Sequence, residues 1–253
     1  MRLKNKTAIV TGASSGIGRE SALRFAAEGA KVVVGARRTA RLETLVDEIR
    51  QTGGTAVFLA GDVCDESYAR SLVELAVKNY GSVDIGFNNA GTLGAMGDVC
   101  ELDLAAWNST LDTNLTSGFL AAKYQLPEML KTGGGSLIFT STFVGHTAGM
   151  PGMSAYAASK AGLLGLTQTL AAEYGPRGVR VNALLPGGTD TDMGEAVANT
   201  PEIKAFVEGL HALKRTAAPS EIANAVLFLA SDESSFMTGE AMLVDGGVSI
   251  NRT

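Results

Sequence analysis

The sequence has few of the residues that mark disulfide-rich, metal-binding or nucleic-acid-binding proteins. Its only two cysteines, Cys64 and Cys100, stand alone, which excludes a disulfide framework and gives no metal-ligand spacing. No block of Lys or Arg interrupts a chain of net charge −5, so no nucleic-acid or membrane surface is expected. The apolar runs are too short for a signal peptide or a membrane span. We therefore expect a cytoplasmic protein without a metal site.

What the sequence does contain is an alternation of short apolar strands and longer helical patterns. Apolar strands separated by helices are typical of a parallel sheet that helices cover on both faces. We predict one α/β domain over residues 1–253, with a doubly wound sheet of about seven parallel strands. The predicted strands are 7–10, 31–36, 55–60, 83–87, 136–140, 179–185 and 241–245, and the predicted helices are 17–28, 39–51, 66–79, 104–130, 155–174 and 219–230.

Turns rich in glycine or polar residues follow several predicted strands. Ligands bind at the carboxyl edge of an open parallel sheet, so we expect these turns to form one site. The long segment 186–215 is expected to be a lid over that site, with a helix from about 201 to 213. The turns lie at 12–18, 88–91, 141–142 and 186–187.

The stretch TGASSGIG, residues 11–18, permits two interpretations. It has the G-x-S-x-G spacing of a hydrolase, in which Ser14 would be the nucleophile and His146 or His211 its base. It is also a glycine-rich turn before a helix, where free N–H groups and the helix dipole would bind phosphate. Its place in the first βα unit favours the phosphate interpretation. The predicted cofactor contacts in this loop are Gly12, Ser14, Ser15, Gly16, Ile17 and Gly18.

The end of the second predicted strand bears on the choice of cofactor. An acid there suits the free 2′-hydroxyl of NAD, whereas an arginine suits the 2′-phosphate of NADP. Arg37 and Arg38 stand there and no acid does, so we predict NADP(H), through Arg37, with NAD(H) as the alternative. Otherwise the two arginines are surface residues that open the next helix. Asp62 and Val63, after the third strand, are placed to contact adenine.

One tyrosine of the five has a lysine four residues later: Tyr156 and Lys160, in YAASK. This spacing puts both side chains on one face of a helix. A phenol has a pKa of about 10 and is a poor acid or base at neutral pH unless its anion is stabilised. A neighbouring ammonium and a cationic nicotinamide would lower that pKa by about three units, or roughly 4 kcal/mol.

Taken together, these motifs resemble the single-domain short-chain dehydrogenase/reductase family. TGASSGIG, NNAG, Asn114, the turn at 141–142, YAASK, PGGTDT and LVDGG follow in that family's order and approximate spacing, across essentially the whole chain. The resemblance implies a Rossmann-type fold, hydride transfer between a nicotinamide and a small-molecule carbonyl or secondary alcohol, and a homo-oligomer, tetramer or dimer. Helices 104–130 and 155–174 would carry the contacts between subunits.

The resemblance also implies a role for each matching residue. Tyr156 would donate a proton to a carbonyl or accept one from an alcohol, and Lys160 would bind the nicotinamide ribose and lower the Tyr156 pKa. A hydroxyl after the fifth strand would orient the substrate oxygen, and Asn114 would hold a water on the proton path. The other implied cofactor contacts are Asn89, Ala90, Gly91, Pro186, Gly187, Thr189 and Thr191.

The chain departs from the family pattern near the substrate. The segment from Gly145 to Tyr156 is one residue longer than usual, and Thr142 stands where serine is common. Neighbouring strand residues point to opposite faces, so Ser141 and Thr142 should not both reach the pocket, and counting from Gly145 favours Thr142. His146 and His211 are expected in a loop contact and on the lid surface. Phe143, Met150, Met153 and Met193 predict an adaptable apolar wall.

A protein of another class remains as the alternative to an enzyme. A sensor or scaffold would bind the dinucleotide without turnover. Such a protein needs no proton relay, so the set Asn114, Thr142, Tyr156 and Lys160 favours the oxidoreductase.

Overall fold

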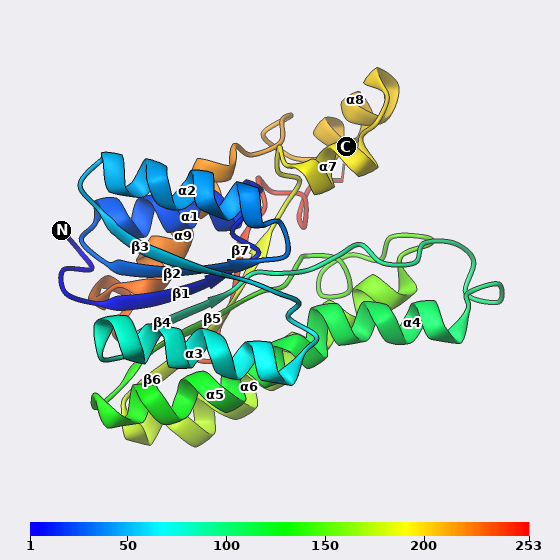
Figure 1. Ribbon diagram of the computed structural model, residues 1–253. Helices are drawn as coiled ribbons and strands as arrows, with labels where there is room; N and C mark the ends of the chain where they lie inside the picture. Colours follow the sequence, from blue (N-terminus) through cyan, green and yellow to red (C-terminus); the bar gives the residue numbers. More distant parts are fainter. Residues whose placement is uncertain (253) are drawn as a thin grey trace.

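The computed structural model describes residues 1–252 and contains a seven-stranded sheet in the order β3-β2-β1-β4-β5-β6-β7 (Figure 1). All neighbouring strands pair in parallel. The predicted doubly wound parallel sheet is therefore confirmed. The strands are β1 (Thr7–Thr11), β2 (Lys31–Ala36), β3 (Thr55–Ala60), β4 (Ile85–Asn88), β5 (Gly135–Thr140), β6 (Val179–Pro186) and β7 (Ala241–Val244).

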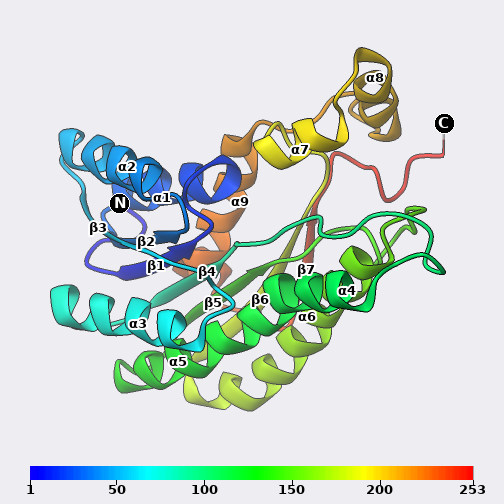
Figure 2. The same cartoon turned by 45° about the vertical axis from the view of Figure 1, so that its right-hand side comes forward.

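Helices cover both faces of this sheet (Figures 1 and 2). One layer contains α1 (Gly16–Ala27), α2 (Thr39–Gln51) and α9 (Pro219–Ala230), and the other contains α3 (Glu66–Tyr80), α5 (Ser117–Lys131) and α6 (Ser154–Tyr174). The remaining helices are α4 (Leu104–Leu111), α7 (Asp192–Val197) and α8 (Pro201–Leu210), a π-helix at Asp112–Thr116, and 3₁₀ turns at Gly175–Arg177 and Asp232–Ser234.

The core lies on both sides of the sheet, which explains the uninterrupted apolar strands. Ala8 and Val10 of β1 face the layer of α1, α2 and α9, whereas Ile9 between them faces the other layer. The same alternation continues along β2. Full burial of each such Val or Ile stabilises the fold by about 1.5–3 kcal/mol. The carboxyl edge of the sheet is thereby held as a rigid base for loops.

Two helical predictions differ from the structure. The predicted helix 104–130 is interrupted by the π-helix, which apolar periodicity does not reveal. Segment 186–215 holds two short helices instead of one, because Thr191 caps Gly194 N–H at 3.1 Å and Thr200 caps Ile203 N–H at 3.3 Å. Among residues 1–252, we find no helix with both the length and the apolar character needed to cross a membrane.

Candidate active site

The glycine loop between β1 and α1 has a backbone that requires glycine. Gly12 and Gly16 adopt positive φ angles of 67° and 53°. A Cβ on Gly18 would lie 2.4 Å from the carbonyl oxygen of Gly12, so helix and loop touch through their backbones. Ser15, which precedes α1, forms no side-chain cap. The first N–H groups of α1, beside Ile17, are thus oriented to bind an anion.

The two arginines after β2 are placed differently. Arg38 donates to the Ser14 hydroxyl at 3.1 and 3.0 Å and to the Ser15 hydroxyl at 2.8 Å. It also pairs with Asp192 at the start of α7, at 3.1 Å. The Arg37 side chain is exposed. The residue that contacts the glycine loop is therefore Arg38, the neighbour of the one that the sequence favoured.

The predicted adenine contacts lie at the end of β3. Asp62 is exposed, and its carboxylate accepts from Cys64 N–H at 3.0 Å. Val63 is half-buried and lines a small cavity together with Thr11 and Ala90. The Cys64 thiol is also hydrogen-bonded to the Asp62 carboxylate.

Thr11 joins the glycine loop to the turn after β4. Its hydroxyl accepts from the N–H groups of Asn89 and Ala90 at 3.1 and 3.2 Å, and its carbonyl accepts from the Asn89 amide at 3.3 Å. Thr140 at the end of β5 donates to Asn89 at 3.1 Å. Three neighbouring strands are therefore fixed to one another at the site edge.

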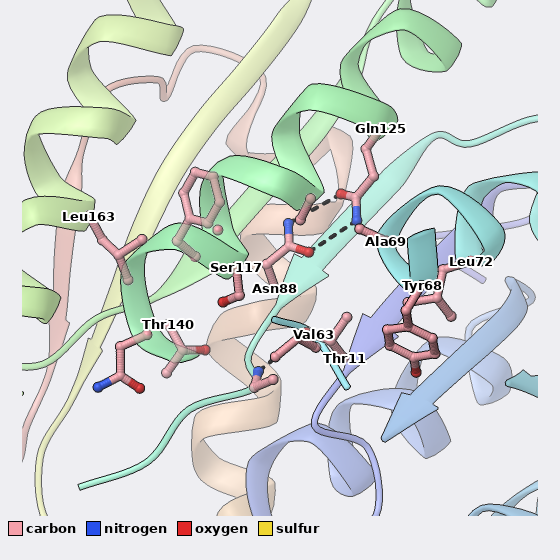
Figure 3. A pocket seen from close by; sticks show the side chains of 15 residues that line it. Thr11, Val63, Tyr68, Ala69, Leu72, Asn88, Ser117, Gln125, Thr140 and Leu163 are labelled. Atoms are coloured by element: carbon pink, nitrogen blue, oxygen red, sulfur yellow. Dashed lines mark hydrogen bonds between the residues drawn. The ribbon is translucent and has the colours of Figure 1, made fainter. Parts of the chain in front are cut away.

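A small cavity lies behind this turn (Figure 3). Asn88 and Gln125 exchange two hydrogen bonds across its wall, at 3.1 and 3.0 Å. Its volume of about 20 Å³ is enough for one water molecule. Asn114 and Ser117 also line it, so such a water would have polar partners.

Helix α6 and the π-helix contribute the buried polar groups of the site. Lys160, only 4% exposed, donates to the Thr140 carbonyl at 2.7 Å. Asn114, in the π-helix, accepts from Thr92 N–H at 2.8 Å and donates to Thr92 O at 2.9 Å and to Ser159 Oγ at 3.0 Å. A Cβ on Gly91 would lie 3.0 Å from Asn114 Oδ1 and 3.1 Å from Lys160 Nζ. The structure thus brings Gly91, Asn114 and Lys160 together.

The two hydroxyls after β5 have different partners. Ser141 donates to the Lys160 backbone carbonyl at 2.8 Å. Thr142 forms a hydrogen bond with the Tyr156 side chain and accepts from Val144 N–H at 3.3 Å. Ser141 therefore bonds to the backbone of α6, while Thr142 lies beside the phenol.

Burial has the largest effect on the pKa values of Tyr156 and Lys160. It raises the pKa of Tyr156, and the hydrogen bond from Thr142 opposes that rise only in part. The direction is opposite to the lowering expected from Lys160, whose ammonium is bound to the Thr140 carbonyl. Burial lowers the pKa of Lys160 to about 8. Near neutral pH, Tyr156 is therefore a neutral hydrogen-bond donor.

Segment 186–215 begins against the glycine loop. Pro186, the last residue of β6, lies beside Val244 of β7. The next residue, Gly187, extends this pairing, because its N–H donates to the Val244 carbonyl at 3.1 Å. Thr189 donates to the Gly187 carbonyl at 3.0 Å. A Cβ on Gly16 would lie 2.8 Å from the Thr191 methyl. The threonines of PGGTDT thus lie at the same edge as the phosphate loop.

His211 corrects the sequence prediction, because it is 2% exposed and not on a lid surface. Its Nε2 accepts from Gly188 N–H at 2.9 Å, so Nδ1 carries the proton and donates to the Val207 carbonyl at 2.8 Å. The ring also packs against Gly246. His211 therefore fixes the end of α8 to the turn after β6, whereas His146 is exposed in its loop.

Several residues that position the site were not expected from the sequence, although two of them lie inside its motifs. Thr11 belongs to TGASSGIG and Ser159 to YAASK. The burial of His211 could not be read from the sequence, because a single histidine in a polar segment predicts an exposed side chain. Within residues 1–252, no group of His, Cys, Asp or Glu is arranged to hold a metal ion.

Comparison with known proteins gives matches over nearly the whole chain. A family model described as enoyl-(acyl carrier protein) reductase matches residues 12–249. A cyclohexanol dehydrogenase of Acinetobacter sp. (strain SE19) is 36% identical over 97% of this chain and 95% of its own. The 3-oxoacyl-[acyl-carrier-protein] reductase FabG of Thermotoga maritima is 40% identical over 99% of this chain and 100% of its own.

Solved structures of dehydrogenases also match nearly the whole chain. A short-chain type dehydrogenase/reductase from Mycobacterium marinum superposes with a TM-score of 0.93 at 35% identity, over 98% of this chain and 97% of its own. A 7α-hydroxysteroid dehydrogenase complexed with NADH and 7-oxo glycochenodeoxycholic acid gives 0.93 at 36%, over 97% and 95%. The chain therefore belongs to the short-chain dehydrogenase/reductase family of oxidoreductases.

Proposed function

We propose that this protein is an NAD(P)-dependent oxidoreductase that transfers a hydride between a nicotinamide and a carbonyl or secondary alcohol. The observation that carries the proposal is the buried Tyr156, which is hydrogen-bonded to Thr142. Tyr156 lies on α6, the helix that also carries Lys160. A sensor that only binds a dinucleotide has no use for a buried phenol beside a second hydroxyl.

The residues at the sheet edge fit a dinucleotide. The uncapped start of α1 offers N–H groups to a pyrophosphate, and Gly12 and Gly18 let the loop pack closely against α1 and the turn after β4. Gly91 has no side chain to fill the space beside Asn114 and Lys160. Lys160 would hold a ribose there, and Thr189 and Thr191 would contact the carboxamide and phosphates.

The chain's own residues supply positioning and the proton. When bound, the nicotinamide would give a hydride to the carbonyl carbon, or take one from an alcohol. Tyr156 Oη gives its proton to the substrate oxygen as the C=O bond becomes C–OH, while Thr142 holds that oxygen. The raised pKa keeps Tyr156 protonated for reduction. For oxidation, Tyr156 would accept a proton as the phenolate, an anion that a neighbouring positive charge would stabilise.

The test of this function is direct. NADPH and NADH are titrated by fluorescence, and a panel of ketones and secondary alcohols is then assayed with the preferred cofactor. Turnover of at least one compound supports an oxidoreductase. Cofactor binding without turnover across the panel would favour the sensor, and labelling of Ser14 by a serine-directed reagent would favour the hydrolase.

We expect NADP(H) to be preferred, because Arg37 and Arg38 stand at the end of β2 without an acid. Arg37→Asp should weaken the binding of NADPH roughly tenfold or more, because one charge-assisted pair with the 2′-phosphate is lost. The binding of NADH should weaken less. Arg24→Asp, at an exposed position in the last turn of α1, is the matched control, and Arg38→Ala tests the arginine that contacts Ser14 and Ser15. Tighter binding of NADH by the unmodified protein would contradict this preference.

We also expect a homo-oligomer whose subunit contacts cover α4, α5 and α6. Leu104 and Phe119 on these helices are 70% and 50% exposed. Light scattering at micromolar concentration should give a dimer or tetramer, and Phe119→Glu should lower that mass. Lys78→Glu on α3 is the control. A stable monomer of the unmodified protein would refute the expectation.

A further inference from the structure

Tyr156 belongs to a cluster of apolar side chains, with the Thr142 hydroxyl as its hydrogen-bond partner. Phe143, Val144 and Val248 are buried against it. Met150, Met153 and Leu210 pack on the same cluster and are partly exposed. These residues, here named the Tyr156 cluster, come from the loop after β5, the end of α8 and the C-terminal segment. A substrate that reaches the phenol must therefore pass along hydrocarbon.

A groove of about 350 Å³ lies beside this cluster. It lies between the loops 97–99 and 149–154 and shares Met150, Met153 and Ala157 with the Tyr156 cluster. Its wall holds one ionisable side chain, Asp98, among the described residues. The Ser154 hydroxyl, also on the wall, is buried and has no hydrogen-bond partner in the described chain.

Helix α8 continues the apolar surface on the other side. Ile203, Phe206, Val207 and Leu210 follow the i, i+3, i+4, i+7 spacing and so lie on one face of the helix. Leu210 packs on the Tyr156 cluster, whereas Phe206 is 66% exposed. The exposed part of this stripe is thus continuous with the buried site and available to a bound molecule.

The wall of the groove carries no positive charge. No lysine or arginine among residues 1–252 lines it, and the buried Lys160, one turn after Tyr156 on α6, is bound to the Thr140 carbonyl at 2.7 Å. The bases of the nearby segment 186–215 have other partners. Lys204 lies 4.0 Å from Glu208, Lys214 donates to the Gly209 carbonyl at 3.0 Å, and Arg215 pairs with Glu221 at 2.7 Å. An anionic substrate would lose hydration, gain no counter-charge and meet Asp98 at the entrance.

We infer that the substrate is an uncharged, largely apolar ketone or secondary alcohol, held between the groove and the apolar stripe of α8. This inference rests on the proposed function. It makes a carboxylate, or an acyl thioester carried on a phosphate-bearing arm, a poor substrate, although the matching family model is named for an acyl-carrier-protein reductase.

Matched substrate pairs test the charge. Methyl 4-oxocyclohexanecarboxylate is compared with 4-oxocyclohexanecarboxylate, and the N-acetylcysteamine thioester of acetoacetate with acetoacetyl-CoA. The neutral member should have about 100-fold higher kcat/KM in each pair that reacts, because the anion is desolvated without a partner. Asp98→Lys should raise the anion's relative kcat/KM by about fivefold or more.

Variants of α8 test the position. Phe206→Ala should raise KM for the neutral ketone roughly tenfold, since apolar contact area is lost, with cofactor Kd unchanged. Lys204→Ala, on the polar face of the same helix, should leave KM nearly unchanged. Equal effects of the two variants would overturn the docking on α8.

The outcomes separate the two proposals. Equal or faster reduction of the anionic members would overturn the substrate inference and leave the oxidoreductase intact. No turnover of any pair, in either direction and with either cofactor, would overturn the proposed function and the substrate inference together.

Discussion

Tyr156→Phe should abolish most turnover while leaving the affinity for the cofactor unchanged. The substitution removes only the phenolic oxygen from a side chain that is 9% exposed, so the packing with Phe143 and Val144 remains. General acid catalysis contributes on the order of 10²–10⁴-fold, and we expect kcat to fall by at least that amount. Steady-state kinetics and NADPH titration by fluorescence measure the two quantities separately.

A second tyrosine on the same helix provides the control. Tyr174 lies at the end of α6 and stacks on Arg177, with 4.0 Å from the guanidinium to the ring centroid. Tyr174→Phe makes the identical chemical change away from the site and should keep nearly normal kcat. Near-normal turnover by Tyr156→Phe would instead show that Tyr156 is not the catalytic acid or base.

The fold followed from the sequence because its strands are buried on both faces. A strand such as β2 is apolar at successive positions, and the helices between strands leave only parallel connections. The site edge followed for the same reason, since the turns after β1, β4, β5 and β6 belong to neighbours in the sheet. Local pattern and global topology agree at these positions.

What could not be predicted depends on tertiary contacts. The π-helix that carries Asn114 has the same apolar pattern as an α-helix, and only its bonds to Thr92 and Ser159 distinguish its role. The burial of His211 depends on Gly188 and Val207, which come from separate segments. The raised pKa of Tyr156 depends on burial, which spacing to Lys160 does not reveal.

The structure also sharpens the interpretation of the glycine loop. A hydrolase would need Ser14 beside a histidine, but its hydroxyl accepts from Arg38, and the buried His211 uses both ring nitrogens on Gly188 and Val207. A nucleophile requires a base within hydrogen-bond reach. Ser14 has a cation beside it instead, which is the surrounding expected of an anion-binding loop.

Substitutions at Thr142 should have the next largest effect and identify the hydroxyl that holds the substrate oxygen. Thr142→Val keeps the shape of the side chain and removes the donor, so kcat/KM should fall by roughly 10²-fold, the usual cost of one lost donor to a developing charge. Thr142→Ser keeps the hydroxyl and loses the methyl group, so most activity should remain. Both are measured by steady-state kinetics on the same ketone.

Ser141→Ala is the matched comparison, because Ser141 is the adjacent hydroxyl. Its Oγ donates to the Lys160 backbone carbonyl at 2.8 Å, so its loss removes one internal hydrogen bond, worth about 1 kcal/mol of stability. We expect a small decrease in Tm with kcat/KM largely retained. If Ser141→Ala loses activity as severely as Thr142→Val, while Tm is unchanged, the substrate oxygen is held by Ser141 and the assignment of Thr142 is wrong by one residue along the chain.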